Sequence, residues 1–423
     1  MLFRLLRSHL RPYAKLLGVV VLFQTIQATA ELLLPTLNAN IIDKGVLAGD
    51  VSYIKREGAV MLFVTLIQGT CAAIAVYFGS KVAMSFGRDI RAGLFHRVTD
   101  FSAREVGAFG APSLITRITN DVQQVQMLVI MTCTMAIAAP ITIVVGITMA
   151  MREDPGLGII LAVAIPAAAV VLGVIVALMV PAFQKMQERI DQINRVMREQ
   201  ITGIRVVRAF VREPQETERF ADANRDLTEV SLRGGRLMSS MFPLVNLLIN
   251  LSSAAVIWLG ADRISSGEIE VGSMIAYLTY IVQILWSVVM ATFMVSMIPR
   301  AAVSSVRIME VLDTDPSVVP PVDPVRTLRA KGQLDVQGVG FHYPGAEHAV
   351  LSDITFRTRP GTTTAIVGST GAGKSTLVNL LPRLFDATSG RVLVGGVDVR
   401  DVPIAELRSA VAIVRAPADP AHL

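Results

Sequence analysis

A glycine-rich segment in the last quarter of the chain has the residue types and spacing needed to hold phosphate. It reads Gly368-Ser369-Thr370-Gly371-Ala372-Gly373-Lys374-Ser375-Thr376 and matches G-x-x-x-x-G-K-[ST] at every fixed position. Its glycines let backbone N–H groups curl around phosphate oxygens, and the positive end of the apolar helix that follows points at the same anion. We expect Lys374 to reach the β- and γ-phosphates and the Ser375 hydroxyl to bind Mg²⁺. The pattern predicts nucleoside triphosphate binding without deciding the enzyme class.

Short alternating runs predict strands upstream of this loop. They are Leu334–Phe341, Ile354–Arg357 and Thr362–Val367, and the third leads directly into Gly368. A strand, the loop and then a helix is the context that the motif requires, which argues against a chance glycine-rich turn. Tyr343 follows the first strand, where it would either stack on a purine base or pack on the domain's surface. Spacing alone does not decide between these two roles.

The composition of the whole chain places this loop in a membrane protein. Of 423 residues, 52% are hydrophobic and 17% are charged, and the mean hydropathy is +0.55. Soluble chains carry about 25% charged residues. The net charge of +5 comes without a basic stripe interleaved with aromatic residues, which argues against nucleic acid as a partner. Two cysteines inside apolar runs and five scattered histidines exclude a disulfide framework and a zinc cluster.

Six apolar stretches are long enough to cross a bilayer as helices, which takes about 20 residues. They are Leu16–Leu37, Val60–Phe78, Met127–Met149, Gly156–Val180, Met238–Leu259 and Gly272–Ile298. The N-terminal segment and the second and fourth connections hold four, six and eleven Lys or Arg residues, against three, one and one in the other connections. By the positive-inside rule both termini face the cytoplasm. The two basic connections, 79–126 and 181–237, read as helical extensions of the spans.

Polar residues inside the spans are candidates either for a transport pathway or for hydrogen bonds between helices. They are Gln24, Gln27 and Glu31 on one face of the first span, Asn246 and Asn250 on the fifth, and Gln283 on the sixth. A methionine stripe on the sixth span suits varied apolar ligands or ordinary packing, and comprises Met290, Met294 and Met297. Residues 2–10 predict an interfacial helix on the inner leaflet, with a frayed basic tail as the alternative.

A change in composition divides the chain into two domains. Between Asp313 and Lys331 the sequence is rich in Pro, Asp and Val, which is typical of a linker. We expect a six-helix transmembrane domain over 1–312, a linker over 313–332 and a nucleotide-binding domain over 333–423. The expected fold class is an α-helical membrane domain with long cytoplasmic extensions plus an incomplete α/β P-loop domain.

Together these features resemble the ATP-binding cassette (ABC) exporters, in particular half-transporters of the multidrug and lipid exporter type. The loop GSTGAGKST matches the family's phosphate loop, and Tyr343 stands in its adenine-stacking position. Three cytoplasmic segments match family patterns, namely Thr116–Val122, Glu199–Phe210 and Arg300–Leu312. The resemblance implies ATP and Mg²⁺ as cofactors, with residues 368–376 around the phosphates and Ser375 on the metal.

The resemblance also implies partners and a location. A second half-transporter would complete a dimer in the inner (cytoplasmic) membrane, and a small amphipathic or lipid-like molecule would be the substrate. Short coupling helices that dock on nucleotide-binding domains are implied near Phe101–Phe109 and Ala209–Glu213. The run Leu393–Asp398 fits the family's early antiparallel strand.

One departure from the family follows the expected strand Val411–Val414. The family has Pro-Gln there, whereas this chain reads Arg415-Ala416-Pro417, and the signature motif, the second acidic strand and the switch histidine do not follow. We expect the nucleotide-binding domain to be truncated after Val414 by a frameshift or an early stop, which leaves no catalytic residue to assign. Three functions stay open: an ATPase-coupled exporter subunit, a half that contributes only ATP binding to a heterodimer, and a membrane-anchored nucleotide-binding protein without transport.

Overall fold

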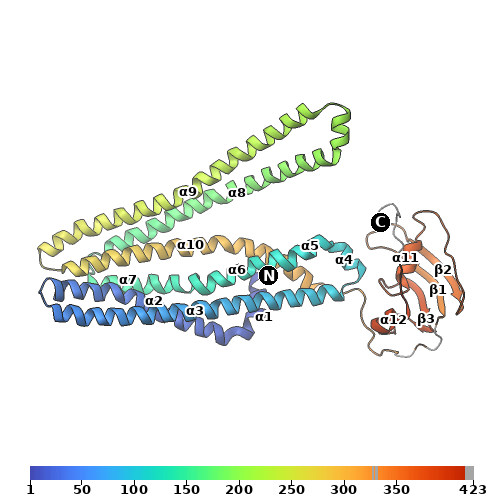
Figure 1. Cartoon of the computed structure of the whole chain (residues 1–423), viewed down its shortest axis with the longest axis horizontal. Coiled ribbons are helices and arrows are strands. Elements are labelled where there is room, and N and C mark those ends of the chain that lie inside the picture. Colours follow the sequence, from blue (N-terminus) through green and yellow to red (C-terminus); the bar gives the residue numbers. More distant parts are fainter. Residues whose placement is uncertain (326–327, 329–331, 415–423) are drawn as a thin grey trace. The chain divides into compact units, whose positions relative to one another are not determined.

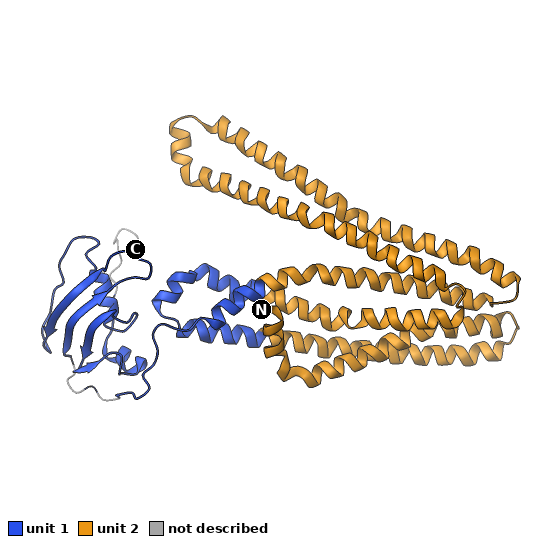
Figure 2. Ribbon diagram, turned by 180° about the vertical axis from the view of Figure 1, so that it is seen from behind, with its two compact units in different colours: residues 1, 88–122, 304–423 blue, residues 2–87, 123–303 orange. Residues whose placement is uncertain are grey.

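The computed structural model describes residues 1–325, 328 and 332–414. These residues divide into two compact units (Figure 2). Unit 1 contains Met1, residues 88–122 and the chain from residue 304 onward. Unit 2 contains residues 2–87 and 123–303, which hold most of the apolar helical sequence. Each unit is described below by itself.

Six helical stretches are long and apolar enough to cross a membrane. They are Leu2–Val46, Val51–Asp100, Ala111–Glu153, Gly158–Ala209, Glu213–Ser265 and Val271–Asp313. Each carries one of the six predicted spans, although the fourth begins two residues later than predicted. The 52 residues of the fourth stretch measure roughly 78 Å at the helical rise. Because a bilayer core is about 30 Å thick, the predicted extensions beyond the membrane are confirmed as helix.

Several of these stretches contain more than one element (Figure 1). The elements of the first three are α1 (Leu2–Leu10), η1 (Arg11–Tyr13), α2 (Ala14–Asn40), η2 (Ile41–Val46), α3 (Val51–Asp100), α4 (Ala103–Phe109), α5 (Ala111–Thr116), η3 (Arg117–Asp121), α6 (Val122–Met131), η4 (Thr132–Ala136) and α7 (Ala138–Glu153). The remaining long helices are α8 (Gly158–Ala209), α9 (Glu213–Ser265) and α10 (Val271–Asp313). Residues 2–10 are therefore helical, as predicted.

Three of the short elements, η2, η3 and η4, are π-helical. The i→i+5 bonding of a π-helix widens the turn and changes which backbone carbonyls are free. In η4, the carbonyls of Cys133 and Thr134 accept hydrogen bonds of 3.2 and 3.3 Å from Nε2 of Gln24 on α2. Gln24 is buried, so this amide joins two helices, as the hydrogen-bonding alternative predicts.

The interior of unit 2 is built around two buried tyrosines on α10. Tyr277 and Tyr280 are fully buried among apolar side chains from α2, α7, α8 and α9. The Tyr277 hydroxyl donates to the carbonyl of Leu157 over 2.7 Å, and the Tyr280 hydroxyl donates to that of Leu32 over 2.8 Å. A buried hydroxyl without a partner is costly, so these two bonds fix how α10 packs on its neighbours.

A small antiparallel sheet forms the centre of the last part of the chain. Its strands are β1 (Leu334–Phe341), β2 (Leu351–Thr358), β3 (Ser389–Val394) and β4 (Val397–Asp398), in the order β2-β1-β3-β4. Two short helices, α11 (Lys374–Leu380) and α12 (Ile404–Ala410), contribute Leu377 and Leu407 to the core beneath it. The strands predicted at Leu334–Phe341 and Ile354–Arg357 are confirmed, as is antiparallel pairing within Leu393–Asp398.

Two other predicted strands are wrong. Neither Thr362–Val367 nor Val411–Val414 is a strand in the structure. Both runs are apolar enough for a strand, but backbone groups need a neighbouring strand to pair with. Within residues 332–414 neither run has such a partner, and Val367 and Val414 are 91% and 92% exposed. The expected fold class of a helical membrane domain with a partial nucleotide-binding domain is nevertheless confirmed.

Candidate nucleotide-binding site

The phosphate loop leads into α11, which begins at Lys374. Two of its glycines, Gly371 and Gly373, have φ values of +87° and +83°, which side chains with a Cβ rarely adopt. At Gly373 a Cβ would lie 2.8 Å from Cδ2 of Leu351 and 3.1 Å from the carbonyl oxygen of Val350. Glycine is therefore required at position 373 both by backbone conformation and by space.

The charged group of the loop lies against the loop's own backbone. Nζ of Lys374 donates hydrogen bonds of 2.9 and 2.7 Å to the carbonyl oxygens of Gly368 and Ser369. The neighbouring Ser375 is exposed, and within the described residues its hydroxyl has no hydrogen-bond partner. The loop thus offers an ammonium group held close to the backbone and one free hydroxyl.

The structure brings Tyr343 and the start of α11 together. The Tyr343 hydroxyl lies 3.2 Å from Oγ1 of Thr376, which is buried. The tyrosine ring is half-buried and meets Phe341 and Phe385 edge to face, with ring centroids 4.9 and 5.7 Å away. The Thr376 side chain is therefore buried against Tyr343 and does not face solvent. Its contact and those of the two phenylalanines hold the Tyr343 ring in a fixed orientation beside the loop. Its stacking on adenine stays a prediction.

These groups fit a nucleoside triphosphate with its metal. The glycines remove side chains from the loop, Lys374 supplies a positive charge, and the Ser375 hydroxyl is a hard oxygen of the kind that Mg²⁺ binds. Among the described residues there is no cluster of three or more His, Cys, Asp or Glu that would hold a metal by itself.

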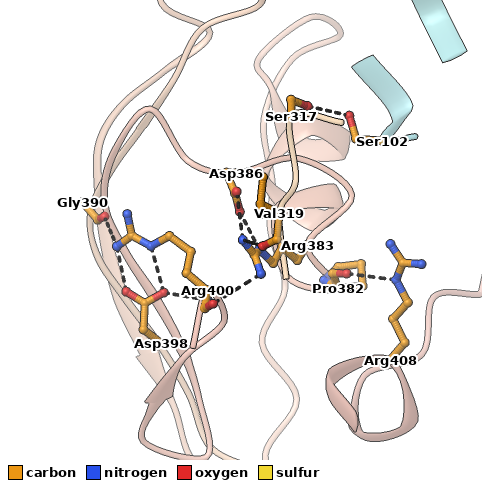
Figure 3. A network of polar contacts seen from close by, with 10 residues as sticks. All are labelled: Ser102, Ser317, Val319, Pro382, Arg383, Asp386, Gly390, Asp398, Arg400 and Arg408. Carbon is orange, nitrogen blue, oxygen red and sulfur yellow. Dashed lines mark hydrogen bonds and ion pairs between the residues drawn. The ribbon is translucent and has the colours of Figure 1, made fainter. Parts of the chain in front are cut away.

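A buried arginine connects the loop's helix to the linker (Figure 3). Arg383, just beyond α11, is 4% exposed and pairs with Asp386 over 2.7 Å. It also donates to the carbonyl oxygens of Val319 and Arg400, over 3.0 and 3.3 Å. Arg400 in turn pairs with Asp398 over 2.7 Å. Burial would raise the pKa of Asp398, but the hydrogen bonds and charge of Arg400 outweigh burial and lower it.

The first loop that was predicted to be cytoplasmic carries a capped helix that contacts the linker. α4 begins after Ser102, whose hydroxyl accepts from the backbone N–H of Arg104, while the Glu105 carboxylate accepts from the backbone N–H of Ser102. The hydroxyls of Ser102 and Ser317 lie 2.9 Å apart (Figure 3). Burial would raise the pKa of Glu105, yet hydrogen bonds from Ser102 and Ser317 lower it overall. The helix predicted near Phe101–Phe109 is thus present, and its cap contacts the linker.

Two segments that matched family patterns, Thr116–Val122 and Arg300–Leu312, contact one another. Arg117 is 9% exposed and donates to the Glu310 carboxylate over 2.7 Å and to the Arg307 carbonyl over 2.8 Å. Asp121 accepts from the Ser304 hydroxyl over 3.1 Å and pairs with Arg307 over 3.3 Å. The exit of the sixth span is therefore joined to the first loop through buried polar contacts.

The second loop that was predicted to be cytoplasmic differs from its predicted structure. No separate short helix lies at Ala209–Glu213, because α8 ends at Ala209, residues 210–212 turn, and α9 begins at Glu213. Pro214 in the first turn and the acidic Glu213 and Glu216 favour a helix start at this point. The residues of the implied coupling helix are therefore the last residue of α8, the turn at 210–212 and the first residue of α9.

The polar residues of the spans have different surroundings. Glu31 and Gln283 line one pocket of unit 2, together with Met290 of the methionine stripe. Gln27 donates to Glu31 over 3.0 Å. Asn246 and Asn250 are exposed in the single chain. The structure thus brings together the first and sixth spans' candidates but not those of the fifth.

Some of the residues described above were not singled out from the sequence. A signal existed for α4, because Ser102-Ala103-Arg104-Glu105 is a Ser-x-x-Glu capping box. For the contact of Arg383 with Val319 and for the pairing of Arg117 with Glu310, no local signal exists, since the partners lie far apart in the chain.

Comparison with known proteins agrees with these observations. Residues 17–288 match the family model for the ABC transporter transmembrane region, and residues 351–420 match that for the ABC transporter. An uncharacterised ABC transporter ATP-binding protein of Mycobacterium tuberculosis is 49% identical over 98% of this chain and 71% of its own length.

Two further relatives have more specific names. An ATP-dependent lipid A-core flippase of Pseudomonas fluorescens is 30% identical over 97% of this chain and 70% of its own length. A multidrug efflux ATP-binding/permease protein of Mycobacterium bovis is 31% identical over 80% of this chain and 28% of its own length. The chain belongs to the ABC transporter family, and its six apolar helices make it a multi-pass membrane protein.

Proposed function

We propose that this chain is one subunit of an ATP-driven exporter that works as a dimer. The observation that carries the proposal is the phosphate loop at 368–376, which stands in the same chain as six membrane-spanning helices and leads into α11. The distribution of Lys and Arg among the connections supports an inner-membrane protein with both termini in the cytoplasm, where ATP is present. The substrate class that fits the family is a small amphipathic or lipid-like molecule.

The roles of the loop residues follow from their positions. Lys374 would exchange the carbonyls of Gly368 and Ser369 for phosphate oxygens, and the Ser375 hydroxyl would bind Mg²⁺. Backbone N–H groups of residues 369–374 would surround the phosphates, since the glycines leave that space open. Bound ATP with Mg²⁺ supplies the phosphoryl group whose transfer to water releases free energy for transport. Tyr343 would stack on the adenine ring.

Contacts within unit 1 offer a physical route from this site to the helices. Arg383 holds the linker at Val319, and Ser317, two residues earlier, contacts the cap of α4. A change around α11 would therefore be felt at the first cytoplasmic loop through a short series of hydrogen bonds.

The proposal is tested by nucleotide binding and by turnover in lipid. We expect the purified chain to bind a fluorescent ATP analogue with Mg²⁺ and Lys374→Ala to weaken that binding at least about tenfold, a difference of about 1.4 kcal/mol. Lys185→Ala, an exposed lysine of α8, is the matched control and should bind normally. Equal binding by Lys374→Ala and wild type would contradict the proposal.

Turnover distinguishes the proposed exporter subunit from its alternatives. ATP hydrolysis should be measured with and without the product of any neighbouring half-transporter gene. Hydrolysis that depends on both Lys374 and the second protein would support a heterodimer, and hydrolysis by the chain alone would support a homodimer. Binding without hydrolysis in either case would favour a membrane-anchored nucleotide-binding protein.

A further inference from the structure

A pocket of about 380 Å³ lies inside unit 2, among helices that carry the spans. It is lined by side chains of α2, η4, α7 and α10. Its volume falls in the range of about 300–1,000 Å³ that small-molecule sites occupy. The pocket is therefore large enough to hold a compact organic molecule.

The charge in the lining of this pocket is negative only. Glu31 is the one charged residue among those that line it, and none of them is Lys or Arg. The carboxylate accepts one hydrogen bond, from Nε2 of Gln27 over 3.0 Å, and within the described residues it forms no ion pair. A carboxylate at membrane depth without a positive partner is costly, which makes a positively charged occupant favourable.

A second acceptor lies in the same pocket without a partner. The amide oxygen Oε1 of Gln283 is buried, and no described residue donates to it. An unsatisfied buried acceptor costs about 1–3 kcal/mol. Glu31 and Gln283 come from different helices, α2 and α10. One molecule bound in the pocket could therefore interact with an acceptor oxygen from each helix.

The remaining walls suit an apolar and polarisable ligand body. Trp286 presents an indole ring, and Met135 and Met290 supply flexible thioether side chains. An aromatic face attracts a cation by about 0.5–2 kcal/mol, depending on how far it is desolvated. Carboxylate, amide oxygen and indole therefore favour the same sign of charge.

We propose that this pocket binds a monovalent organic cation with an apolar body. The inference rests on the proposed function only in taking the pocket for a substrate site. A lipid phosphate group would need Lys or Arg, and the pocket's lining contains neither. The pocket thus resembles a site for cationic compounds more than one for the charged part of an anionic lipid.

The test compares two ions of nearly equal size and opposite charge, tetraphenylphosphonium and tetraphenylborate. The chain has two tryptophans, and Trp258 is 77% exposed, so Trp258→Phe leaves Trp286 as the single reporter in the pocket. The full chain in this background, placed in lipid nanodiscs, is titrated with each ion and followed by tryptophan fluorescence. Nanodiscs without protein correct for partitioning into lipid.

We expect saturable binding of the cation and at least about tenfold weaker binding of the anion. Glu31→Gln should weaken cation binding about tenfold, Glu31→Asp should retain most of it, and Gln283→Leu should weaken it about threefold. Glu268→Gln, which removes an exposed carboxylate outside the pocket, is the matched control and should bind as wild type.

Several results would overturn the inference. They are absence of cation binding, equal binding of the two ions, or unchanged binding in Glu31→Gln. If Glu31→Gln does not fold, cation binding by Gln283→Leu is compared with that of the wild type, and unchanged binding would overturn the inference. Because the titration contains no nucleotide, intact cation binding with absent ATP turnover would contradict the proposed function alone. Normal turnover without cation binding would contradict this inference alone.

Discussion

The two connections that are rich in Lys and Arg, 79–126 and 181–237, have very different surroundings. In the first loop, Glu105, Arg117 and Asp121 are each at least nine-tenths buried and bonded to the linker or to the exit of α10. In the second, the α8–α9 hairpin, the turn residues Phe210 and Val211 are 72% and 75% exposed. Figure 1 shows this hairpin as two long helices joined at one end.

The difference lies in the contacts that each loop forms with other parts of its own chain. The first loop is fixed by hydrogen bonds and ion pairs within unit 1. In the second, the polar contacts lie within the hairpin, such as the ion pair of Arg189 with Asp226 over 3.2 Å, whose side chains are nearly half exposed. Exposed ion pairs stabilise little. The tip of the hairpin is apolar and exposed in this chain, and its coupling function stays a prediction from the family resemblance.

The largest effect should follow from Arg117→Ala. This change leaves the Arg307 carbonyl and the Glu310 carboxylate without their donor and removes the guanidinium from the Phe109 ring, 4.8 Å away. We expect a loss of about 2–3 kcal/mol of local stability. Hydrogen exchange of backbone amides in 103–121 would measure it. The matched variant in the second loop, Arg189→Ala, should change protection there by less than about 0.5 kcal/mol. Equal losses in the two variants would contradict the conclusion that polar contacts stabilise the first loop more than the second.

A smaller effect should follow from Ser102→Ala. The alanine cannot accept from the N–H of Arg104, so the cap of α4 is lost, at about 1 kcal/mol. The expected result is faster exchange in α4 alone, and Ser102→Thr, which keeps the hydroxyl, should restore protection. Unchanged exchange in the alanine variant would mean that packing alone holds α4.

Acidification should weaken the helix α4 of the first loop through its residue Glu105. The pKa of Glu105 lies below its ordinary value of 4.5 in the folded protein, so its hydrogen bonds stabilise α4 at neutral pH. That contribution is lost as the pH falls below about 4.5, because the unfolded state then binds the proton more readily. Exchange rates of α4, corrected for their intrinsic pH dependence, should show the transition in wild type and none in Glu105→Gln.

The smallest effect should come from Phe210→Ser. The ring is exposed in this chain, so its removal should alter the thermal unfolding of the isolated protein by no more than about 0.5 kcal/mol. A large destabilisation would show that the tip packs on its own chain. A decrease in partner-dependent ATP hydrolysis without loss of stability would support docking on another molecule.

Features set by local composition could be predicted from the sequence. The six helices follow from apolar length, and the phosphate loop follows from the positions of Gly368, Gly373 and Lys374. Both depend on residues close together in the chain, so their physical requirements are visible in a short window.

Features that need distant partners could not be predicted in the same way. Thr362–Val367 has the composition of a strand but finds none to pair with in the described residues, and composition does not reveal that. The contact of Arg117 with Glu310 joins positions 193 residues apart. The departure from the family expected after Val414 falls on residues 415–423, which lie outside the described residues.

The π-helical segment η4 has a consequence for the rotational phase of the third span. A π-turn holds one more residue than the α-turn it replaces, and one residue corresponds to about 100° of rotation. Faces counted along α6 therefore do not continue onto α7, so that a helical wheel drawn through both would misplace Ala139 and Thr142, which line the pocket. Removing one residue within Thr132–Ala136 would turn α6 relative to α7 by that angle. In a homologue that is shorter by one residue here, a different face of α7 would therefore line the pocket beside the residue that corresponds to Glu31.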